Sequence, residues 1–331
     1  MKKFEYGMAK NLAGAFEFLK EPDAKIKAGG IDMLDLMKEG LESPKRLVNI
    51  RSVQALNFVK KDEDGNLRIG ATTTLAEIAA NSEIQTGYRA LAQAANAIAT
   101  PQIRNVATLG GNLCQRPRCW YFRSADFKCL RNEGDICFAE DGENKYHAIF
   151  GNKDDCVFVH PSGTAVALMA LQAKLVIANK KERREIEIAN FWVTPEDDVT
   201  RENILKRDEI VTEIILPPTQ KNTKSFYFKQ KEKQSFDWPI ADVAVALEMK
   251  GKTCVGSKIV LGSAAPIPWR IEKAENVLQN KTISVSLARQ AAAAAMADAN
   301  PLSQNGYKVP VFKAVIYRTI CRATGIDPFA A

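Results

Sequence analysis

Residues 25–38 decide the fold and read Lys-Ile-Lys-Ala-Gly-Gly-Ile-Asp-Met-Leu-Asp-Leu-Met-Lys. The first four residues indicate a short strand, Gly29 and Gly30 form a turn, and residues 31–38 have the apolar spacing of a helix. Paired glycines let backbone N–H groups approach a phosphate, and a helix N-terminus directly after the turn favours negative charge. A glycine pair before a helix is more often only a turn, so this loop alone is weak evidence for a ligand.

A second glycine pair lies in residues 103–112, Ile-Arg-Asn-Val-Ala-Thr-Leu-Gly-Gly-Asn. Thr108 and Asn112 flank it with side chains that can hydrogen-bond phosphate or ribitol oxygens. Two such loops in one domain favour a pyrophosphate-containing cofactor more strongly than either loop alone. The chain has neither Gly-x-Gly-x-x-Gly nor Gly-x-x-x-x-Gly-Lys-Ser/Thr, so Rossmann and P-loop domains are poor interpretations.

The predicted elements divide the chain into two parts. The first part alternates helices and strands, which favours an α/β arrangement; the expected elements are helices at 10–20, 31–38, 74–80 and 87–100 and strands at 25–28, 46–50 and 66–71. A further strand is predicted at 156–161, and Ser162 is expected to cap a helix over 163–172.

Pro217 to Asn222 is the best candidate for a linker. Beyond it the pattern predicts a small domain of antiparallel strands (225–229, 241–249 and 258–261) and helices (274–278, 286–298 and 311–323). We therefore predict an α+β protein with domains at 1–218 and 223–328, the first divided into subdomains at about 1–58 and 59–218.

Five of the seven cysteines fall between residues 114 and 156. The stretch from 115 to 153 is polar and aperiodic, and a loop of this length in a compact domain needs a reason such as a prosthetic group. An odd number of cysteines without an export signal argues against a disulfide framework. Four thiolates can hold an iron–sulfur cluster or a zinc ion, and the spacing alone leaves both open.

Bulk properties exclude several classes of function. The net charge is +7, but the basic residues are spread along the chain, so nucleic-acid binding is not expected. The N-terminus lacks the apolar stretch of a signal peptide, and the most apolar run, 165–178, is too short to span a bilayer, which predicts a soluble, cytoplasmic protein. His147 and His160 are the two histidines, and no nucleophile elbow or carboxylate pair predicts a catalytic centre.

The chain resembles the medium, FAD-binding subunits of molybdenum hydroxylases, the family of xanthine dehydrogenase and carbon monoxide dehydrogenase. It is most similar to the aldehyde oxidoreductase branch of periplasmic type. The matching motifs lie in order over nearly the whole length: 28–38, 69–71, 103–112, His160-Pro161-Ser162, 228–229 with 235–237, and 261–263 with 268–270.

This resemblance implies an FAD-binding domain of the PCMH or vanillyl-alcohol-oxidase type, followed by a C-terminal domain of the carbon monoxide dehydrogenase flavoprotein type. It implies no catalytic side chain, because the subunit binds a cofactor and transfers electrons. Ile31 and Gly163 depart from the family, which usually has Thr and often Asp there. The implied FAD contacts are Lys25, Ile26, Lys27, Ala28, Gly29, Gly30, Ile31, Asp32, Met33, Thr108, Gly111, Asn112 and Lys229.

Residues 115–122 resemble the cluster-bearing insertion of the aldehyde oxidoreductase branch. The resemblance implies a [4Fe-4S] cluster whose ligands are Cys119, Cys129, Cys137 and Cys156, with Cys114 a core residue or spare thiol. It also implies partners that carry a molybdenum cofactor (the large subunit) and a [2Fe-2S] cluster (the small subunit), in a heterotrimer or a dimer of heterotrimers. The alternatives are a stand-alone flavin oxidase of the vanillyl-alcohol-oxidase type and a zinc-stabilised binding module.

Overall fold

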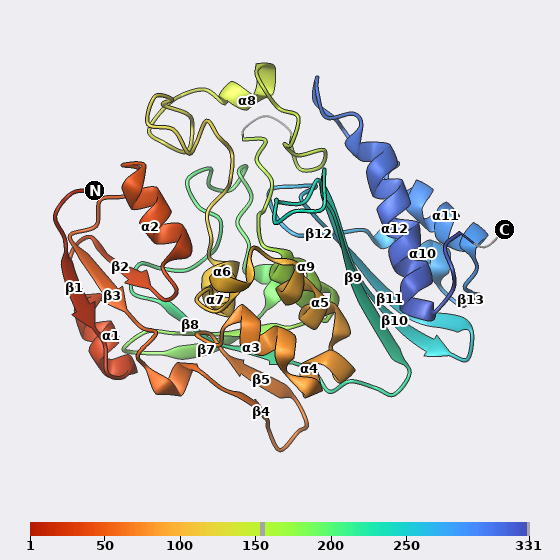
Figure 1. Ribbon diagram of the computed structural model, residues 1–331, viewed down its shortest axis with the longest axis horizontal. Coiled ribbons are helices and arrows are strands. Elements are labelled where there is room, and N and C mark those ends of the chain that lie inside the picture. Colours follow the sequence, from red (N-terminus) through yellow and green to blue (C-terminus); the bar gives the residue numbers. More distant parts are fainter. Residues whose placement is uncertain (153–155, 330–331) are drawn as a thin grey trace.

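The computed structural model describes residues 1–152 and 156–329 and contains three β-sheets, each with its own helices (Figure 1). The three sheets follow one another along the chain, and the cysteine loop, residues 114–152, extends above the central one in this view. Both sequence-derived expectations of fold class are confirmed: the chain is α+β, and its second part is an antiparallel sheet with helices.

The parallel-sheet unit comes first and consists of β1 (Glu5–Met8), α1 (Leu12–Phe18), β2 (Ala24–Lys27), α2 (Ile31–Lys38) and β3 (Arg46–Asn49). Its strands pair in the order β1-β3-β2, all parallel. The α1 helix begins where the Asn11 side chain accepts a hydrogen bond from Gly14 N at 2.8 Å. Ala15, Leu19 and Val48 are buried between α1 and the sheet, so the unit has its own small core.

The central unit is a five-stranded sheet in the order β4-β5-β8-β6-β7, with its helices on one side. Its largest core includes α9, whose residues are nearly all buried and apolar around the whole helix. As predicted, Ser162 caps α9 by accepting from Ala165 N at 3.1 Å. The elements are η1 (Gln54–Leu56), β4 (Val59–Lys61), β5 (Leu67–Gly70), α3 (Leu75–Ala80), α4 (Ser82–Gly87), α5 (Arg89–Ala97), α6 (Pro101–Arg104), α7 (Leu109–Leu113), α9 (Gly163–Ala170), β6 (Lys174–Ala178), β7 (Arg183–Glu187), η2 (Ile188–Asn190) and β8 (Ile210–Leu216).

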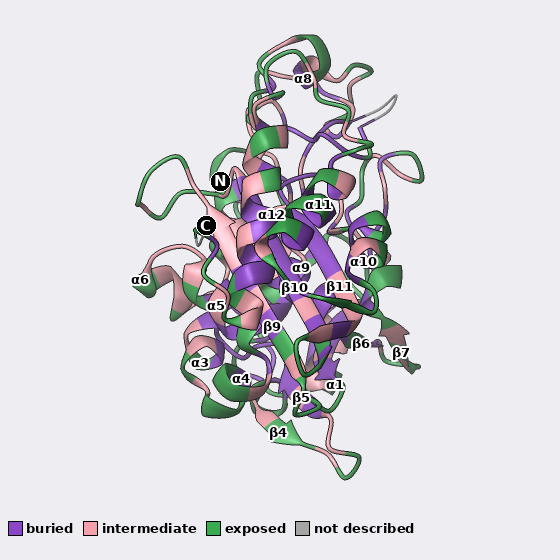
Figure 2. Cartoon of the chain, turned by 90° about the vertical axis from the view of Figure 1, so that its right-hand side faces the viewer, coloured by how far each residue is buried: buried purple, intermediate pink, exposed green. Residues whose placement is uncertain are grey.

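The C-terminal unit is an antiparallel sheet covered by three helices. Its strands run in the order β12-β11-β10-β9, with β13 paired to β11. Figure 2 shows that β10 and β11 are largely buried beneath α12 and α11. The elements are β9 (Thr223–Gln230), β10 (Ala241–Lys250), β11 (Thr253–Gly262), β12 (Trp269–Arg270), α10 (Glu272–Leu278), β13 (Lys281–Thr282), α11 (Val285–Ala295) and α12 (Lys308–Thr324).

The predicted strand at 156–161 is wrong. The backbone there is extended, but its hydrogen bonds go to two different segments instead of one neighbouring strand. Ala148 N donates to Val157 O at 2.8 Å, and His160 N donates to Ala265 O at 2.9 Å. Apolar β-branched residues favour an extended chain, yet a strand also needs a continuous partner, which this segment does not have.

The cysteine loop is irregular apart from α8 (Phe138–Asp141), as its lack of periodicity predicts. A polar, aperiodic stretch does not predict a core for these cysteines, yet two of them join one. Cys129 is buried in a small cluster with Leu36 of α2 and Phe122, and Cys119 packs against the same cluster. The loop therefore has a core of its own, built on the parallel-sheet unit.

Lys308 at the start of α12 anchors the far end of the cysteine loop. Its side chain is fully buried, and Nζ donates to the carbonyl oxygens of Tyr146 (3.2 Å), His147 (2.9 Å) and Ser263 (2.5 Å). One cation thus joins the loop to the C-terminal unit.

No helix in the described part of the chain has the length and apolar character needed to cross a membrane.

We expect Lys308→Met to lower the free energy of unfolding by about 2–5 kcal/mol, because three buried carbonyl groups lose their shared hydrogen-bond donor. Burial lowers the pKa of Lys308 to about 7, so this loss does not require the lysine to be charged. Lys313→Met on the exposed face of the same helix is the control and should change stability by less than about 0.5 kcal/mol. Urea denaturation followed by circular dichroism measures both. Equal stability of the two variants would contradict this role for Lys308.

Candidate functional site

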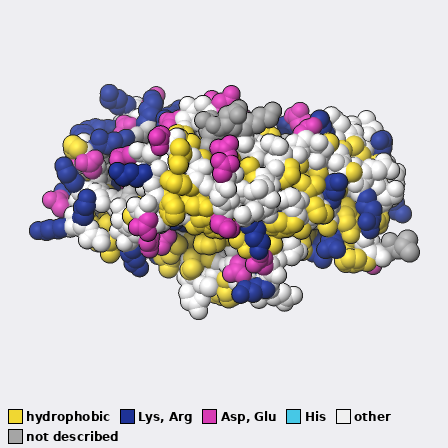
Figure 3. Space-filling view, turned by 90° about the horizontal axis from the view of Figure 1, so that it is seen from above, with side chains coloured by type: hydrophobic (Ala, Val, Ile, Leu, Met, Phe, Trp, Pro, Cys, Tyr) yellow, Lys and Arg dark blue, Asp and Glu magenta, His cyan; other side chains and the backbone are white. Residues whose placement is uncertain are grey.

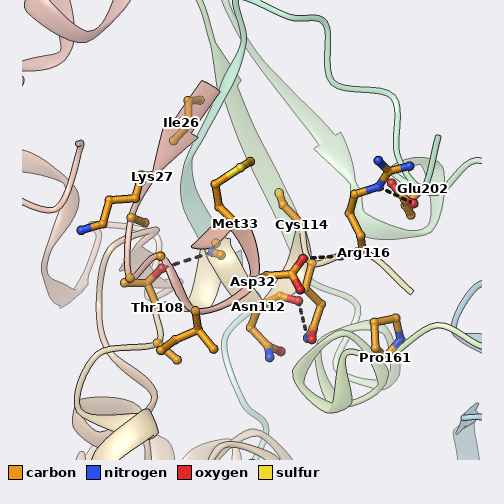
Figure 4. Close-up of a pocket in the computed structure, with 18 of the residues that line it drawn as sticks. Ile26, Lys27, Asp32, Met33, Thr108, Asn112, Cys114, Arg116, Pro161 and Glu202 are labelled. Carbon is orange, nitrogen blue, oxygen red and sulfur yellow. Dashed lines mark hydrogen bonds and ion pairs between the residues drawn. The ribbon is translucent and has the colours of Figure 1, made fainter. Parts of the chain in front are cut away.

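A large cleft, with a volume of about 1010 Å³, is lined by residues of all three units. All of the residues predicted to contact a cofactor line it, although they come from three distant segments, 25–33, 108–112 and Lys229. Figure 4 shows the side chains of the first two segments around this space. In Figure 3, Lys and Arg side chains gather around the end of the molecule that the parallel-sheet unit forms, which favours an anionic ligand.

The first glycine loop is pressed against the second. A Cβ on Gly29 would lie 2.4 Å from the carbonyl oxygen of Val106, so a larger residue would separate the two loops. Gly30 has a φ of 81°, in the left-handed region that favours glycine, and directly precedes α2. The first N–H groups of α2 have no partner within the helix, so this turn presents backbone donors at the cleft.

The second loop is held in shape by its own side chains. Thr108 is buried, and its hydroxyl accepts from Gly111 N at 3.2 Å, which caps α7. The Oδ1 atom of Asn112 accepts from the hydroxyl groups of Ser162 (2.7 Å) and Thr164 (2.6 Å). The sequence predicted that Thr108 and Asn112 bond the ligand directly. In this structure both side chains also hold the loop in shape. The amide oxygen of Asn112 is already bonded, so its amino group is the part of the side chain that remains for a ligand.

Asp32 points from α2 toward the cysteine loop. Its carboxylate accepts from Arg116 N (2.8 Å) and Arg123 (2.7 Å) and forms an ion pair with Arg118. Burial opposes its ionisation, but Arg118 and Arg123 outweigh burial and hold the pKa of this carboxyl below its usual value. Asp32 therefore joins the first glycine loop to the cysteine loop (Figure 4).

The opposite wall of the cleft comes from β9 of the C-terminal unit. Tyr227 and Lys229 lie on one face of this strand, and Asp242 is paired with Lys229 on β10. Tyr227 donates to the buried Asp242 carboxylate at 2.9 Å, while Lys229 Nζ donates to Ala97 O at 3.1 Å. A Cβ on Gly163 would lie 2.7 Å from the Tyr227 hydroxyl oxygen, so Tyr227 fills the space of any side chain there.

Sequence reasoning missed several residues of the cleft. Arg118 and Glu202 line it, and so do Phe236 and Trp238, which are 61% and 65% exposed. Arg118 lies over the Trp238 ring, with 5.9 Å between the guanidinium carbon and the ring centre. The sequence carried a hint of this segment, since residues 235–237 are among the motifs that carry the family resemblance, but it carried none for Glu202.

The four predicted cysteine ligands form a chain of neighbours, in which Cys119 lies near Cys129 and Cys137, and Cys137 lies near Cys156. Cys137 and Cys156 are hydrogen-bonded; this bond lowers the pKa of the Cys137 thiol to about 6 and raises that of Cys156, which burial raises further. Burial raises the pKa of Cys119 to about 11, and the nearby Cys137 and Cys129 add to this effect. Backbone N–H groups near these sulfur atoms, those of Phe122 near Cys119, Val157 near Cys137 and Phe158 near Cys156, act in the opposite direction and favour the thiolate forms.

Within residues 1–152 and 156–329, no three His, Cys, Asp or Glu side chains are arranged closely enough to hold a metal ion. Cys114 lies apart, packed against the central core and lining the cleft.

His147 Nε2 lies 3.2 Å from Cys119 Sγ. His160 is buried against Trp192, with ring centres 4.5 Å apart, and burial lowers its pKa to about 3.

A family model described as the FAD binding domain in molybdopterin dehydrogenase matches residues 2–219. A second, the CO dehydrogenase flavoprotein C-terminal domain, matches residues 226–323. The chain belongs to the FAD-binding subunits of the molybdenum hydroxylase family. The resemblance inferred from the sequence motifs is thereby confirmed.

Relatives in this family match along nearly the whole chain. The aldehyde oxidoreductase FAD-binding subunit PaoB of Escherichia coli is 32% identical over 98% of this chain and 99% of its own. The carbon monoxide dehydrogenase medium chain of Hydrogenophaga pseudoflava is 27% identical over 90% of this chain and 88% of its own. The solved structure of that dehydrogenase lacking the Mo-pyranopterin moiety has a chain with a TM-score of 0.76 and 25% identity, covering 98% of both chains.

The cleft fits the cofactor of the family. Its lining combines two glycine turns, with backbone donors for a pyrophosphate, and an apolar surface that includes Ile26, Ile31 and Ile103. Lys27 and Lys229 lie on two sides of it and add positive charge.

Gly29→Ala should reduce the flavin content of the purified chain by about tenfold, which corresponds to roughly 1.4 kcal/mol of binding free energy. The added Cβ would force the Val106 carbonyl away and open the contact between the loops. Gly306→Ala is the matched control, because a Cβ there meets nothing within 4 Å. Flavin is quantified by absorbance after denaturation. Unchanged flavin content in Gly29→Ala would show that flavin binding does not require the close contact between the two glycine loops.

Lys229 should make stability depend on pH. Burial lowers its pKa in the folded chain from 10.5 to about 8, so between these values the unfolded chain holds more protons and stability rises with pH. The wild type should therefore gain stability relative to Lys229→Met as the pH rises through this window. Denaturant titrations at about pH 7.5 and pH 10 measure the difference. Lys224→Met, exposed on the same strand, should show no such gain.

Proposed function

We propose that this chain binds FAD in the cleft and serves as the electron-transfer subunit of a molybdenum-dependent aldehyde or heterocycle dehydrogenase. The observation that carries the proposal is that the two glycine loops and Lys229, far apart in the sequence, line one cleft. FAD, when bound, supplies a centre that accepts single electrons and passes on pairs. Electrons would come from a partner's [2Fe-2S] cluster and leave to an acceptor.

The chain's own residues then have positional roles. The turn at Gly29 and Gly30 would present N–H groups to the pyrophosphate, and the second loop, fixed by Thr108 and Asn112, would support it from the other side. Lys229 would place its charge at the flavin end, since β9 forms the opposite wall. Phe236 and Trp238 would cover the cleft at its exposed edge.

The partners belong to the same proposal. The relatives' names describe subunits or medium chains of larger enzymes, and a chain with no catalytic constellation of its own suits a role beside a molybdenum-cofactor subunit and a [2Fe-2S] subunit. We propose a heterotrimer or a dimer of heterotrimers, with no nucleic-acid or membrane partner, and a division of this chain into domains at 1–218 and 223–328.

We further propose that Cys119, Cys129, Cys137 and Cys156 hold a [4Fe-4S] cluster. Four thiolates are the ligand set of such a cluster, and hydrogen bonds to its sulfur atoms stabilise it. In support, Cys119 lies near Cys137 and Cys129, Cys137 neighbours Cys156, and nearby backbone N–H groups favour the thiolate forms of Cys119, Cys137 and Cys156. Cys114 is a spare thiol, because it lies on the cleft side.

The visible spectrum of the purified chain, prepared anaerobically with iron and sulfide, tests both parts. We expect flavin bands near ~450 nm above a broad cluster shoulder, with about four irons per chain. Each of the variants Cys119→Ser, Cys129→Ser, Cys137→Ser and Cys156→Ser should lose the cluster shoulder and keep the flavin bands. Cys114→Ser is the control and should keep both.

Each result has a separate meaning. Flavin without iron would reject the cluster and retain the flavoprotein assignment. A colourless chain containing zinc would reject both and support a zinc-stabilised module. Reduction of the flavin by an aldehyde or alcohol without any partner subunit would support a stand-alone flavin oxidase.

A further inference from the structure

Arg131 is a buried cation in the cysteine loop, two residues after Cys129. Its side chain is 0% exposed. Its guanidinium carbon lies 4.5 Å from the ring centre of Phe158 and 5.8 Å from that of Phe122. Phe158 follows Cys156 by two residues, and Phe122 follows Cys119 by three. Arg131 therefore sits among the segments that carry three of the proposed ligands.

One anion compensates this cation. Glu202, whose side chain is 8% exposed, forms an ion pair with Arg131, while the other terminal nitrogen of Arg131 donates to Val199 O. The Nε atom of Arg131 is buried with no hydrogen-bond partner in the described part of the chain, although an N–H group in that position usually has one. A thiolate or sulfide of a cluster would supply the missing acceptor.

Glu202 also belongs to the flavin cleft. It lines the cleft and accepts a second hydrogen bond, from Arg116 Nε at 3.2 Å. Arg116 in turn donates to Glu42 and to Thr200 O, and it lies 4.7 Å from the Phe122 ring centre. The pair Arg131–Glu202 thus spans from the cysteine loop to the wall of the cleft, as the position of Glu202 in Figure 4 shows.

We propose that Arg131 and Glu202 are positioning residues that set the reduction potential of the cluster relative to that of the flavin. The inference rests on the proposed [4Fe-4S] site. A cluster with four thiolates is negatively charged, and reduction adds a further electron. A cation buried beside it stabilises the reduced state, and the nearby carboxylate opposes that effect; both act strongly because the region is shielded from water. Glu202, at the boundary, acts on the flavin with the same sign.

The proposal makes predictions of opposite sign for the two residues. Arg131→Met should shift the cluster potential to lower values, because the reduced state loses its counter-charge. Glu202→Gln should shift the potentials of both cluster and flavin to higher values. The double variant, which removes both charges, should return the cluster potential toward that of the wild type. A residue whose role is only structural would give shifts without this pattern of signs.

The experiment uses the full chain loaded with FAD, iron and sulfide. Anaerobic redox titration, followed by absorbance for the flavin and by electron paramagnetic resonance for the reduced cluster, gives the potentials without any assay of activity. Arg183→Met, whose side chain is 53% exposed on β7, is the control and should leave both potentials unchanged. Iron is counted for every variant before titration.

The outcomes separate the two proposals. Opposite shifts in the single variants at full iron content, with recovery in the double variant, support the inference. Shifts of the same sign, or none, at full iron content overturn it and leave the cluster intact. A wild-type chain that takes up no iron overturns the cluster assignment and this inference with it. If Arg131→Met does not fold, the double variant and Glu202→Gln still decide the sign.

Discussion

The cleft depends on one contact, the approach of the Gly29 backbone to the carbonyl group of Val106. This contact joins the parallel-sheet unit to the central unit, because the two glycine loops meet there. With any side chain at position 29 the loops would stand apart, since a Cβ would come within 2.4 Å of the carbonyl oxygen. The walls of the cleft are then completed by β9, so that elements of all three units share one binding space.

Electrostatics joins the cleft to the cysteine loop. Asp32 on α2 binds Arg118 and Arg123 of the loop, and Glu202 binds Arg116 and Arg131. These ion pairs are largely buried. They therefore contribute more to fixing the position of the cysteine loop relative to the cleft than to the overall stability of the chain. These four arginines belong to the segment that the sequence presented as an aperiodic polar loop. Their charges have specific partners, on α2 and at Glu202.

Local patterns predicted much of the fold and part of the site. The glycine pairs, the Ser162 cap and the strands after residue 222 depend on neighbours in the sequence, and the structure has all of them. Long-range partners could not be predicted this way: Arg131 and Glu202 are 71 residues apart, and nothing near either marks the other. Lysine is seldom fully buried, so Lys308 gave no signal. The strand expected at 156–161 failed because strand formation requires a partner that the local sequence does not specify.

The anchor of the cysteine loop has a consequence for the order of assembly. Lys308 follows Tyr146 and His147 by 162 and 161 residues, so a growing chain exposes the whole loop long before its lysine exists. Until α12 docks, the segment with the thiols at 119, 129 and 137 is held by α2 and by Glu202 but lacks the anchor at its far end. Docking of α12 closes the loop, so an inserted group has open access to the thiols in the interval before this helix docks.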